Sequence, residues 1–447
     1  MTSILGTIFA FVIVFGVLVF VHEFGHFFMA KLVGINVEVF SFGYGKRLFG
    51  FKKKGTDYRI SLIPMGGYVR FAGEEAALEG LKSGGEVKPG DYLAAKRWQR
   101  FLVILCGPVM NLILAFLLVA VINMVGVDVA QWLDKTPVIG WIEPDSPAAK
   151  ADLKIDDTIL SINGDPTPTW HDVEMAVVLR PEKTIQVEID RGGEVRIVDL
   201  LTESITRFQM GYAGFYGKVQ VQVNMVLANQ PAEIAGLQAG DVVTAINGEP
   251  IYYYQFIELL EKSPEQELDF LVERGSESLH LTVIPRKEGE IGKIGIYHTA
   301  RTSEKKFGFF AAFAESYESN RKLLFAVFDF LKNLVIGEAS TRQLGGPIEI
   351  ANVSYAMFRL GFIAMLSWIA FISLQLGIIN LFPVPVFDGG QILVLGLEGA
   401  ARRDFPPKVK QIIMQIGFVI FIFLVVFILL NDVVKRLPNG WSSIIPF

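Results

Sequence analysis

The chain has 447 residues, 51% of them hydrophobic, and its mean hydropathy is +0.42. These values exclude an ordinary soluble globular protein and indicate an integral membrane protein that also carries a soluble insert. The formal net charge of −5 argues against a general affinity for nucleic acid. The single cysteine, Cys106, excludes an intramolecular disulfide.

Four apolar segments are long enough to cross a bilayer: residues 4–21, 101–127, 360–382 and 411–430. The first has no charged leading region and no small-residue cleavage site, so we expect a retained helix and not a signal peptide. Thirteen Lys and Arg residues lie between the first two segments and four between the last two. Because cytoplasmic loops are enriched in these residues, we expect both connections to be cytoplasmic and the termini and the insert to lie on the far side. Lys435 and Arg436 oppose this orientation but are outnumbered.

The insert contains an internal repeat with an offset of 84 residues, which carries Pro147 onto Pro231 and Asp157 onto Asp241. Each copy has a Pro-Ala pair, an Asp-x-Ile/Val motif and an Ile-Asn-Gly turn flanked by alternating apolar and polar residues. The pattern resembles a PDZ domain, and it occurs twice. The plainer interpretation is a small α+β module whose Asn-Gly marks a hairpin turn. A PDZ fold would make the pair a binder of extended peptides or a filter that excludes bulky substrates.

Two further segments have recognisable patterns. In residues 40–71 turn residues bracket an alternating stretch, which predicts β-hairpins that either dip into the membrane near the first helix or lie at the lipid headgroups. Residues 307–336 alternate apolar and charged residues at helical spacing, which predicts an interfacial amphipathic helix.

The first apolar segment ends in His22-Glu23-Phe24-Gly25-His26. In a helix His22 and His26 lie one turn apart on one face, where both imidazoles can bind one metal ion, and Glu23 can reach a metal-bound water. This is the H-E-x-x-H signature of zinc hydrolases. The alternative, that the histidines are satisfied core residues, is disfavoured because polar groups in lipid are costly.

A hydrolytic zinc site commonly has three protein ligands, so a third ligand must come from elsewhere in the chain. The other three histidines all lie in the insert. Asp388 follows the inner end of the third apolar segment, at the same expected depth as His22 and His26. It is the leading candidate, although it could instead cap a turn before Gly389. Pro383 and Pro385 preclude regular helix just before it.

Three motifs, in their order along the chain, resemble those of the site-2 protease family of intramembrane metalloproteases: residues 22–26, residues 107–111 (Gly-Pro-Val-Met-Asn) and residues 380–390. The resemblance covers nearly the whole chain. One departure is Phe387, where the family usually has leucine. The resemblance implies a zinc endopeptidase with His22, His26 and Asp388 as metal ligands and Glu23 as general base.

The resemblance also implies that Asn380 positions the substrate or its oxyanion. The plainer alternative is that Asn380 only ends a helix. We expect the residues around Pro383 and Pro385 to hold the substrate in an extended form. Pro108 and Asn111 could simply kink and pack the second span.

The expected fold is thus an α-helical membrane protein with four transmembrane helices, a membrane-associated β-hairpin loop and two inserted α+β PDZ-like domains. The expected segments are the first span (1–35), the β-rich loop (36–100), the second span (101–127), the PDZ-like domains (128–217 and 218–300), an amphipathic helix with a linker (301–358), the third span (359–390), a cytoplasmic loop (391–410), the fourth span (411–432) and a periplasmic tail (433–447).

By the same resemblance, the expected location is the bacterial inner membrane, with periplasmic PDZ-like domains and an active site toward the cytoplasm. The expected substrates are single-span membrane proteins that another protease has shortened, such as an anti-sigma factor, and also remnant signal peptides. We expect zinc as the cofactor, the lipid bilayer as surroundings, a monomer, and no nucleic-acid partner. The rival hypothesis is a catalytically idle membrane adaptor that holds clients through its PDZ-like domains.

Overall fold

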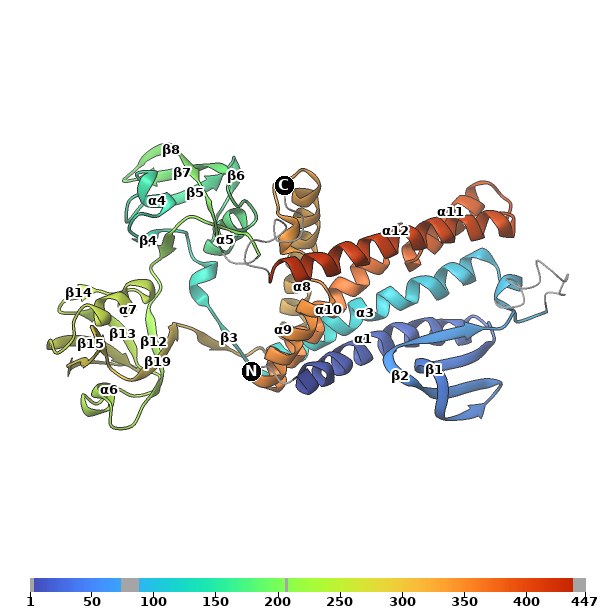
Figure 1. Cartoon of the computed structure of the whole chain (residues 1–447), viewed down its shortest axis with the longest axis horizontal. Helices are drawn as coiled ribbons and strands as arrows, with labels where there is room; N and C mark the ends of the chain where they lie inside the picture. The colour runs from blue at the N-terminus through green and yellow to red at the C-terminus, as the bar shows by residue number, and fades with distance from the viewer. Residues whose placement is uncertain (1–3, 74–87, 206–207, 437–447) are drawn as a thin grey trace. The chain divides into compact units, whose positions relative to one another are not determined.

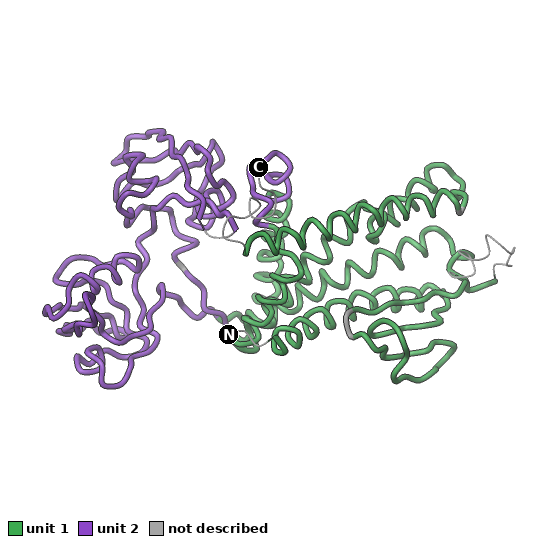
Figure 2. Tube along the Cα trace, in the orientation of Figure 1, with its two compact units in different colours: residues 1–125, 306–329, 344–447 green, residues 126–305, 330–343 purple. Residues whose placement is uncertain are grey.

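A computed structural model describes residues 4–73, 88–205 and 208–436 (Figure 1). Most of the tail expected over residues 433–447 lies outside these ranges. The chain divides into two compact units (Figure 2). The first comprises Met1–Val125, Lys306–Asp329 and Leu344–Phe447, and the second comprises Gly126–Lys305 and Phe330–Gln343.

Among the described residues, four helices of the first unit are long and apolar enough to span a membrane, which confirms the expectation of four spans. They are α1 (Ile4–Leu32), α3 (Arg97–Val125), α10 (Phe362–Asn380) and α12 (Pro407–Val434). Because α1 continues well past residue 21, the His-Glu-x-x-His motif lies inside a regular helix.

The spanning helices pack through small and branched apolar residues. Ala10, Val14 and Leu18 of α1 follow one another every four residues and are fully buried. Val14 and Leu18 pack with Met365 and Ile369 of α10 in one apolar cluster. By contrast, only 6% of the most apolar window of α12 is buried, so most of this helix is free to contact lipid.

Further elements complete the helical part of the first unit. The predicted amphipathic helix is observed as α8, whose Leu323, Leu324 and Val327 pack against α3 and α10. A helix also occupies part of the stretch expected to be a linker, where Gly346 precedes a proline at the first helical position. Another helix begins directly at Asp388, within the end of the expected third span. These elements are α8 (Phe309–Val335), whose last residues belong to the second unit, α9 (Pro347–Leu360), α11 (Asp388–Ala400) and the 3₁₀ turn Tyr92–Ala94. A second 3₁₀ turn, Thr341–Gln343, lies in the second unit.

The predicted hairpins are confirmed as two long strands, β1 (Val37–Lys53) and β2 (Thr56–Phe71). Both strands bend, so that Phe40 pairs with Tyr58 on one side and with Val69 on the other. The result is a small antiparallel sheet of four segments, in the order 67–71, 37–42, 57–61 and 47–53. Residues 67–71 therefore form an edge.

The second unit contains two small α+β domains, each with its own apolar core, as the repeat predicts. The segments that enter and leave this unit pair as β3 (Val127–Val129) and β20 (Ser303–Lys305). The elements of the first domain are a 3₁₀ turn (Gln131–Asp134), β4 (Ile139–Ile142), α4 (Pro147–Lys150), β5 (Thr158–Ile162), β6 (Asp165–Pro166), α5 (Trp170–Val178), β7 (Thr184–Arg191), β8 (Glu194–Leu201), β9 (Glu203–Ile205), β10 (Met210–Tyr212) and β11 (Phe215–Gly217).

In the first domain the main sheet has the order β6-β5-β7-β8, and β11 pairs with β4. In the second domain the sheet runs β16-β15-β13-β12-β19, with β14 beside β13. The elements of the second domain are β12 (Val221–Val226), α6 (Pro231–Ile234), β13 (Val242–Ile246), β14 (Glu249–Pro250), α7 (Tyr253–Glu261), β15 (Leu268–Arg274), β16 (Glu277–Val283), β17 (Arg286–Glu288), β18 (Ile291–Lys293) and β19 (Ile296–Ala300).

Each PDZ-like domain contains the same buried ion pair. Asp157 is 1% exposed and accepts two hydrogen bonds of 2.7 Å from Arg191. Asp241, its partner in the repeat, is also 1% exposed and accepts two hydrogen bonds of 2.7 Å from Arg274. The aspartates of the repeat pattern therefore have a structural purpose, because each anchors the strand that follows it to a later strand of its sheet.

The ion pair with Arg191 also lowers the pKa of the Asp157 carboxyl group. Burial acts to raise the pKa of the Asp157 carboxyl, but hydrogen bonds from Arg191 and from the backbone of Lys154 outweigh it and hold the pKa below its ordinary value of 3.8. A lowered pKa means that the ionised group stabilises the fold. Its contribution is complete above pH 3.8 and is lost as the pH falls through the lower folded pKa.

We expect Arg191→Met to destabilise the first domain by on the order of 3 kcal/mol at pH 7, because it leaves a buried carboxylate unpaired. Hydrogen exchange of the full chain, followed at β5 and β7, measures the change. The difference from wild type should shrink as the pH falls below 3.8. Arg196→Met is the matched control, because Arg196 pairs with Glu194 at the surface. Equal protection in wild type and Arg191→Met would contradict the role of the pair.

Candidate metal centre

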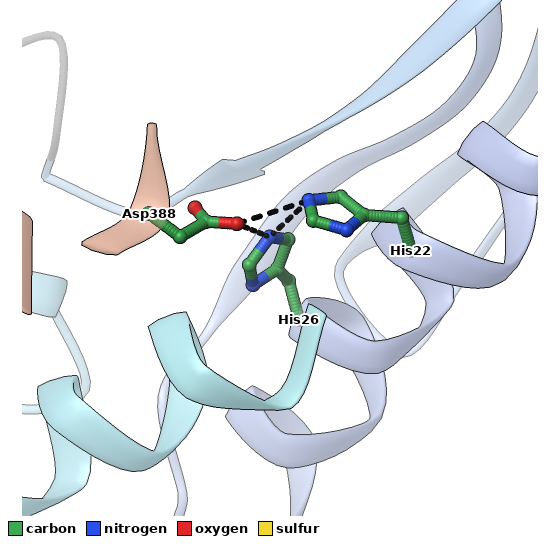
Figure 3. A group of neighbouring side chains, drawn as sticks. All are labelled: His22, His26 and Asp388. Carbon is green, nitrogen blue, oxygen red and sulfur yellow. Dashed lines mark hydrogen bonds and ion pairs between the residues drawn. The ribbon is translucent and has the colours of Figure 1, made fainter. Parts of the chain in front are cut away.

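Helix α1 presents His22 and His26 on one face, one turn apart, as their spacing predicts (Figure 3). Their Nε2 atoms are 3.1 Å apart. The Nδ1 atom of His26 lies 2.8 Å from the carbonyl oxygen of Val103 on α3. A carbonyl can only accept, so His26 carries its proton on Nδ1 and leaves the Nε2 lone pair for a metal.

Two glycines allow α3 to approach this face of α1. A Cβ atom on Gly107 would lie 2.4 Å from Nε2 of His26 and 3.0 Å from Cε1 of His22. A Cβ atom on Gly25 would lie 2.4 Å from the carbonyl oxygen of Cys106. Because real Cβ atoms do not come so close, only glycine fits at either position, and the backbone of α3 forms a wall of the site.

Asp388 reaches the histidines because the chain breaks between α10 and α11. Residues 381–387 are not helical, as Pro383 and Pro385 predict, and α11 starts at Asp388. The first turn of α11 folds back tightly, since a Cβ on Gly389 would lie 2.2 Å from the carbonyl oxygen of Leu381. The N-cap of α11 is Phe387 and not Asp388, so the carboxylate is not used as a cap and points toward the histidine pair (Figure 3).

The three side chains form a triangle with the dimensions of a metal site. Oδ2 of Asp388 lies 3.1 Å from Nε2 of His22 and 3.6 Å from Nε2 of His26. Zinc bonds of about 2.0–2.1 Å at tetrahedral angles place neighbouring ligand atoms about 3.3 Å apart. Oδ2 is buried and has no hydrogen-bond partner among the described residues. A buried carboxylate oxygen facing two imidazole nitrogens can bind a cation, and two His with one Asp are a donor set that suits zinc.

The cluster opens into a cavity of about 410 Å³ within the first unit. Glu23 and Asn380 line this cavity together with the three cluster residues, so five of the predicted site residues are brought together. Pro383 and Pro385 do not line it, and Pro385 lies instead next to Gly417 of α12. The remaining lining residues were not predicted from the sequence, and they are Val19, Tyr44, Val69, Phe71, Tyr92, Val103, Ile104, Leu376, Val386, Phe387 and Gln391.

The β-sheet supplies one side of this cavity. A Cβ atom on Gly67 would lie 3.4 Å from Cγ of Glu23, and the backbone of Val69 lies next to the Glu23 carboxyl group. Both residues belong to the edge segment 67–71. One edge of the sheet formed by this part of the chain therefore lies beside the histidine motif. The sequence pattern carried no signal for the contact with Glu23, because it joins residues far apart in the chain.

We expect Gly107→Ala to lower the zinc content of the purified protein severalfold, because the added methyl group would displace the His26 ring. Metal analysis by mass spectrometry gives the ratio of zinc to protein. Gly396→Ala is the control, since a Cβ there meets no atom within 4 Å. Full zinc occupancy in Gly107→Ala would show that the approach of α3 is not needed for metal binding.

Comparisons with known proteins agree with this geometry. The model of peptidase family M50 matches residues 10–424. The chain is 32% identical over 461 residues to protease RseP of Yersinia pestis, and 32% identical over 459 residues to the regulator of sigma-E protease RseP of Escherichia coli K12. Each alignment covers 97% of this chain and 99% of the relative. A regulator of sigma E protease of Haemophilus influenzae is 30% identical over 457 residues. The chain therefore belongs to peptidase family M50 and is a multi-pass membrane zinc metalloprotease.

Proposed function

We propose that this chain is an intramembrane endopeptidase that cleaves peptide bonds within the transmembrane segments of single-span proteins. One observation carries the proposal. His22, His26, Asp388 and Glu23 open on one cavity that is built from helices long enough to cross a membrane. A hydrolytic centre at that place acts on chains that enter the bilayer.

His22, His26 and Asp388 would hold the metal, and Glu23 would handle the proton. Bound zinc supplies a more acidic water and a polarised substrate carbonyl. Glu23 accepts the proton of the attacking water and then gives it to the leaving amine. The Glu23 carboxyl group lies between the metal cluster and the edge segment 67–71, so it can reach both the water and a substrate on that edge.

Asn380 ends α10 and lines the same cavity without joining the metal cluster. Its amide can donate a hydrogen bond to the carbonyl oxygen on which negative charge develops. Pro383 and Pro385 act less directly, because they keep residues 381–387 out of a helix and so let Asp388 face the cavity. We place the extended substrate along this segment.

A transmembrane helix conceals its carbonyls in its own hydrogen bonds, so a substrate must unwind before it can be cut. The edge segment 67–71 runs beside Glu23, and an unwound segment can add to this edge as a further strand. Substrates with helix-breaking residues would unwind most readily.

The positive charge of the segments that connect the first two spans and the last two spans supports a cytoplasmic position for the end of the helix bundle that carries the metal cluster. Seventeen Lys and Arg residues lie in the two short connections. The two connections also meet, because Arg97 donates a 2.8 Å hydrogen bond to Asp404. The proposed location is the bacterial inner membrane, with the PDZ-like domains in the periplasm.

The names of the relatives refer to regulation of sigma E, which suggests an anti-sigma factor as a client of this chain as well. Remnant signal peptides are a second class of single-span substrate. The PDZ-like domains would admit clients whose outer portion has been removed, either by binding the new end or by excluding bulky domains. We propose that the chain acts as a monomer.

The rival, an idle adaptor, requires no ordered catalytic centre. Family membership and the intact cluster beside Glu23 favour the enzyme. An adaptor also has no need of an acidic residue held between a strand edge and a metal cluster.

We expect Glu23→Gln to abolish cleavage of a single-span reporter with a shortened outer domain while the protein keeps its zinc, because the amide cannot accept the proton. Cleavage is followed on gels and zinc by metal analysis. His22→Phe should lose both cleavage and bound zinc. Continued cleavage by Glu23→Gln would disprove the assigned role, and loss of cleavage with retained client binding separates the enzyme from the adaptor.

We expect Asn380→Leu to lower kcat by roughly 10²–10³ with zinc content unchanged, which is the usual loss when one donor to an oxyanion is removed. Single-turnover kinetics in detergent measure the chemical step. Ser367→Ala is the control on the same helix, because Ser367 is exposed and bonds only to the carbonyl of Ile363. A rise in KM with unchanged kcat would show that Asn380 only binds the substrate.

A further inference from the structure

One buried polar side chain beside the metal cluster has no part in the mechanism described so far. Asn111 of α3 is fully buried, and its Nδ2 lies 3.5 Å from Nδ1 of His22. Its Oδ1 is also buried and has no hydrogen-bond partner among the described residues. Such a group in an apolar bundle needs an explanation, because leaving it unpaired costs about 1–3 kcal/mol.

Metal binding decides which atom of Asn111 must face His22. A histidine that binds a metal through Nε2 carries its proton on Nδ1 and needs an acceptor there. The amide nitrogen of Asn111 cannot accept, but the amide oxygen can. The two ends of an amide have nearly the same shape, so a half-turn of the side chain places Oδ1 against Nδ1 of His22. Since Oδ1 has no other partner, no described hydrogen bond of that atom opposes the turn.

At His26 the corresponding contact between Nδ1 and an acceptor on α3 is already formed. Nδ1 of His26 lies 2.8 Å from the carbonyl oxygen of Val103. Val103, Gly107 and Asn111 follow one another every four residues and so lie on one face of α3. Gly107 brings the helix close, and the residues one turn before and after it each meet one histidine.

The position of Asn111 is itself held. The hydroxyl of Ser373 on α10 donates a 2.8 Å hydrogen bond to the carbonyl oxygen of Asn111, and both residues are fully buried. The side chain therefore projects from a point where α3 is tied to a third helix.

We infer that Asn111 is a positioning residue for the metal: its amide oxygen accepts the Nδ1 proton of His22, which fixes the tautomer and the ring orientation that zinc requires. The inference rests on the proposed ligation by His22. It assigns to Asn111 more than the packing role that its place in a helix would suggest.

The test measures zinc affinity of the purified full chain in detergent, by competition with a chelator of known affinity. Asn111→Leu keeps the size of the side chain and removes the acceptor, and we expect zinc binding about 10–100-fold weaker. Asn111→Asp keeps an acceptor, so its affinity should stay close to wild type. Asn123→Leu is the matched control and should also resemble wild type, because Asn123 is a buried asparagine of the same helix away from the cluster.

Wild-type affinity in a folded Asn111→Leu protein would overturn the inference, and so would equal losses in Asn111→Leu and Asn111→Asp. If leucine prevents folding, as judged by thermal unfolding of the metal-free protein, Asn111→Ala takes its place with the same expected loss. His22→Phe serves as the reference. Unchanged zinc affinity in His22→Phe would refute the ligation itself, whereas loss there together with wild-type affinity in Asn111→Leu would refute only the role of Asn111.

Discussion

Two imidazoles and a carboxylate meet inside a bundle of apolar helices, where their side chains are only 11–13% exposed. Burying such groups without partners is costly, so the surrounding structure must supply either hydrogen bonds or a cation. The bundle offers a hydrogen-bond acceptor and a geometry that suits a cation. Val103 offers an acceptor to His26, and the triangle of Nε2 and Oδ2 atoms has the edge lengths of a zinc site.

The site depends on close approach and on a broken helix. Glycines at positions 25 and 107 let α1 and α3 come into backbone contact, which brings the acceptors of α3 to the histidine rings. The break before α11 turns the chain so that a carboxylate from the third span faces the same point. The bent β-sheet closes the other side and places its edge segment 67–71 next to Glu23. Substrate binding and proton transfer are thereby placed in one cavity.

Much of this centre could be predicted from the sequence, because its main signals are local. The spacing of His22 and His26 implies a shared helix face, and Pro383 and Pro385 imply the break that positions Asp388. The internal repeat identified two domains, and its aspartates proved to be the buried partners of Arg191 and Arg274. Contacts between distant segments carry no such local signal. The approach of the sheet edge to Glu23, the helix α9 and the place of Asn111 beside His22 emerged only from the folded chain.

The central claim is that one metal ion joins α1 to the start of α11 through Asp388. Zinc X-ray absorption spectroscopy of the Asp388→Cys variant tests this directly. The variant is made in a Cys106→Ser background, so that the introduced cysteine is the only thiol of the protein. The account predicts a new zinc–sulfur distance of about 2.3 Å beside two histidine nitrogens. A spectrum with only nitrogen and oxygen neighbours at full zinc occupancy would contradict it.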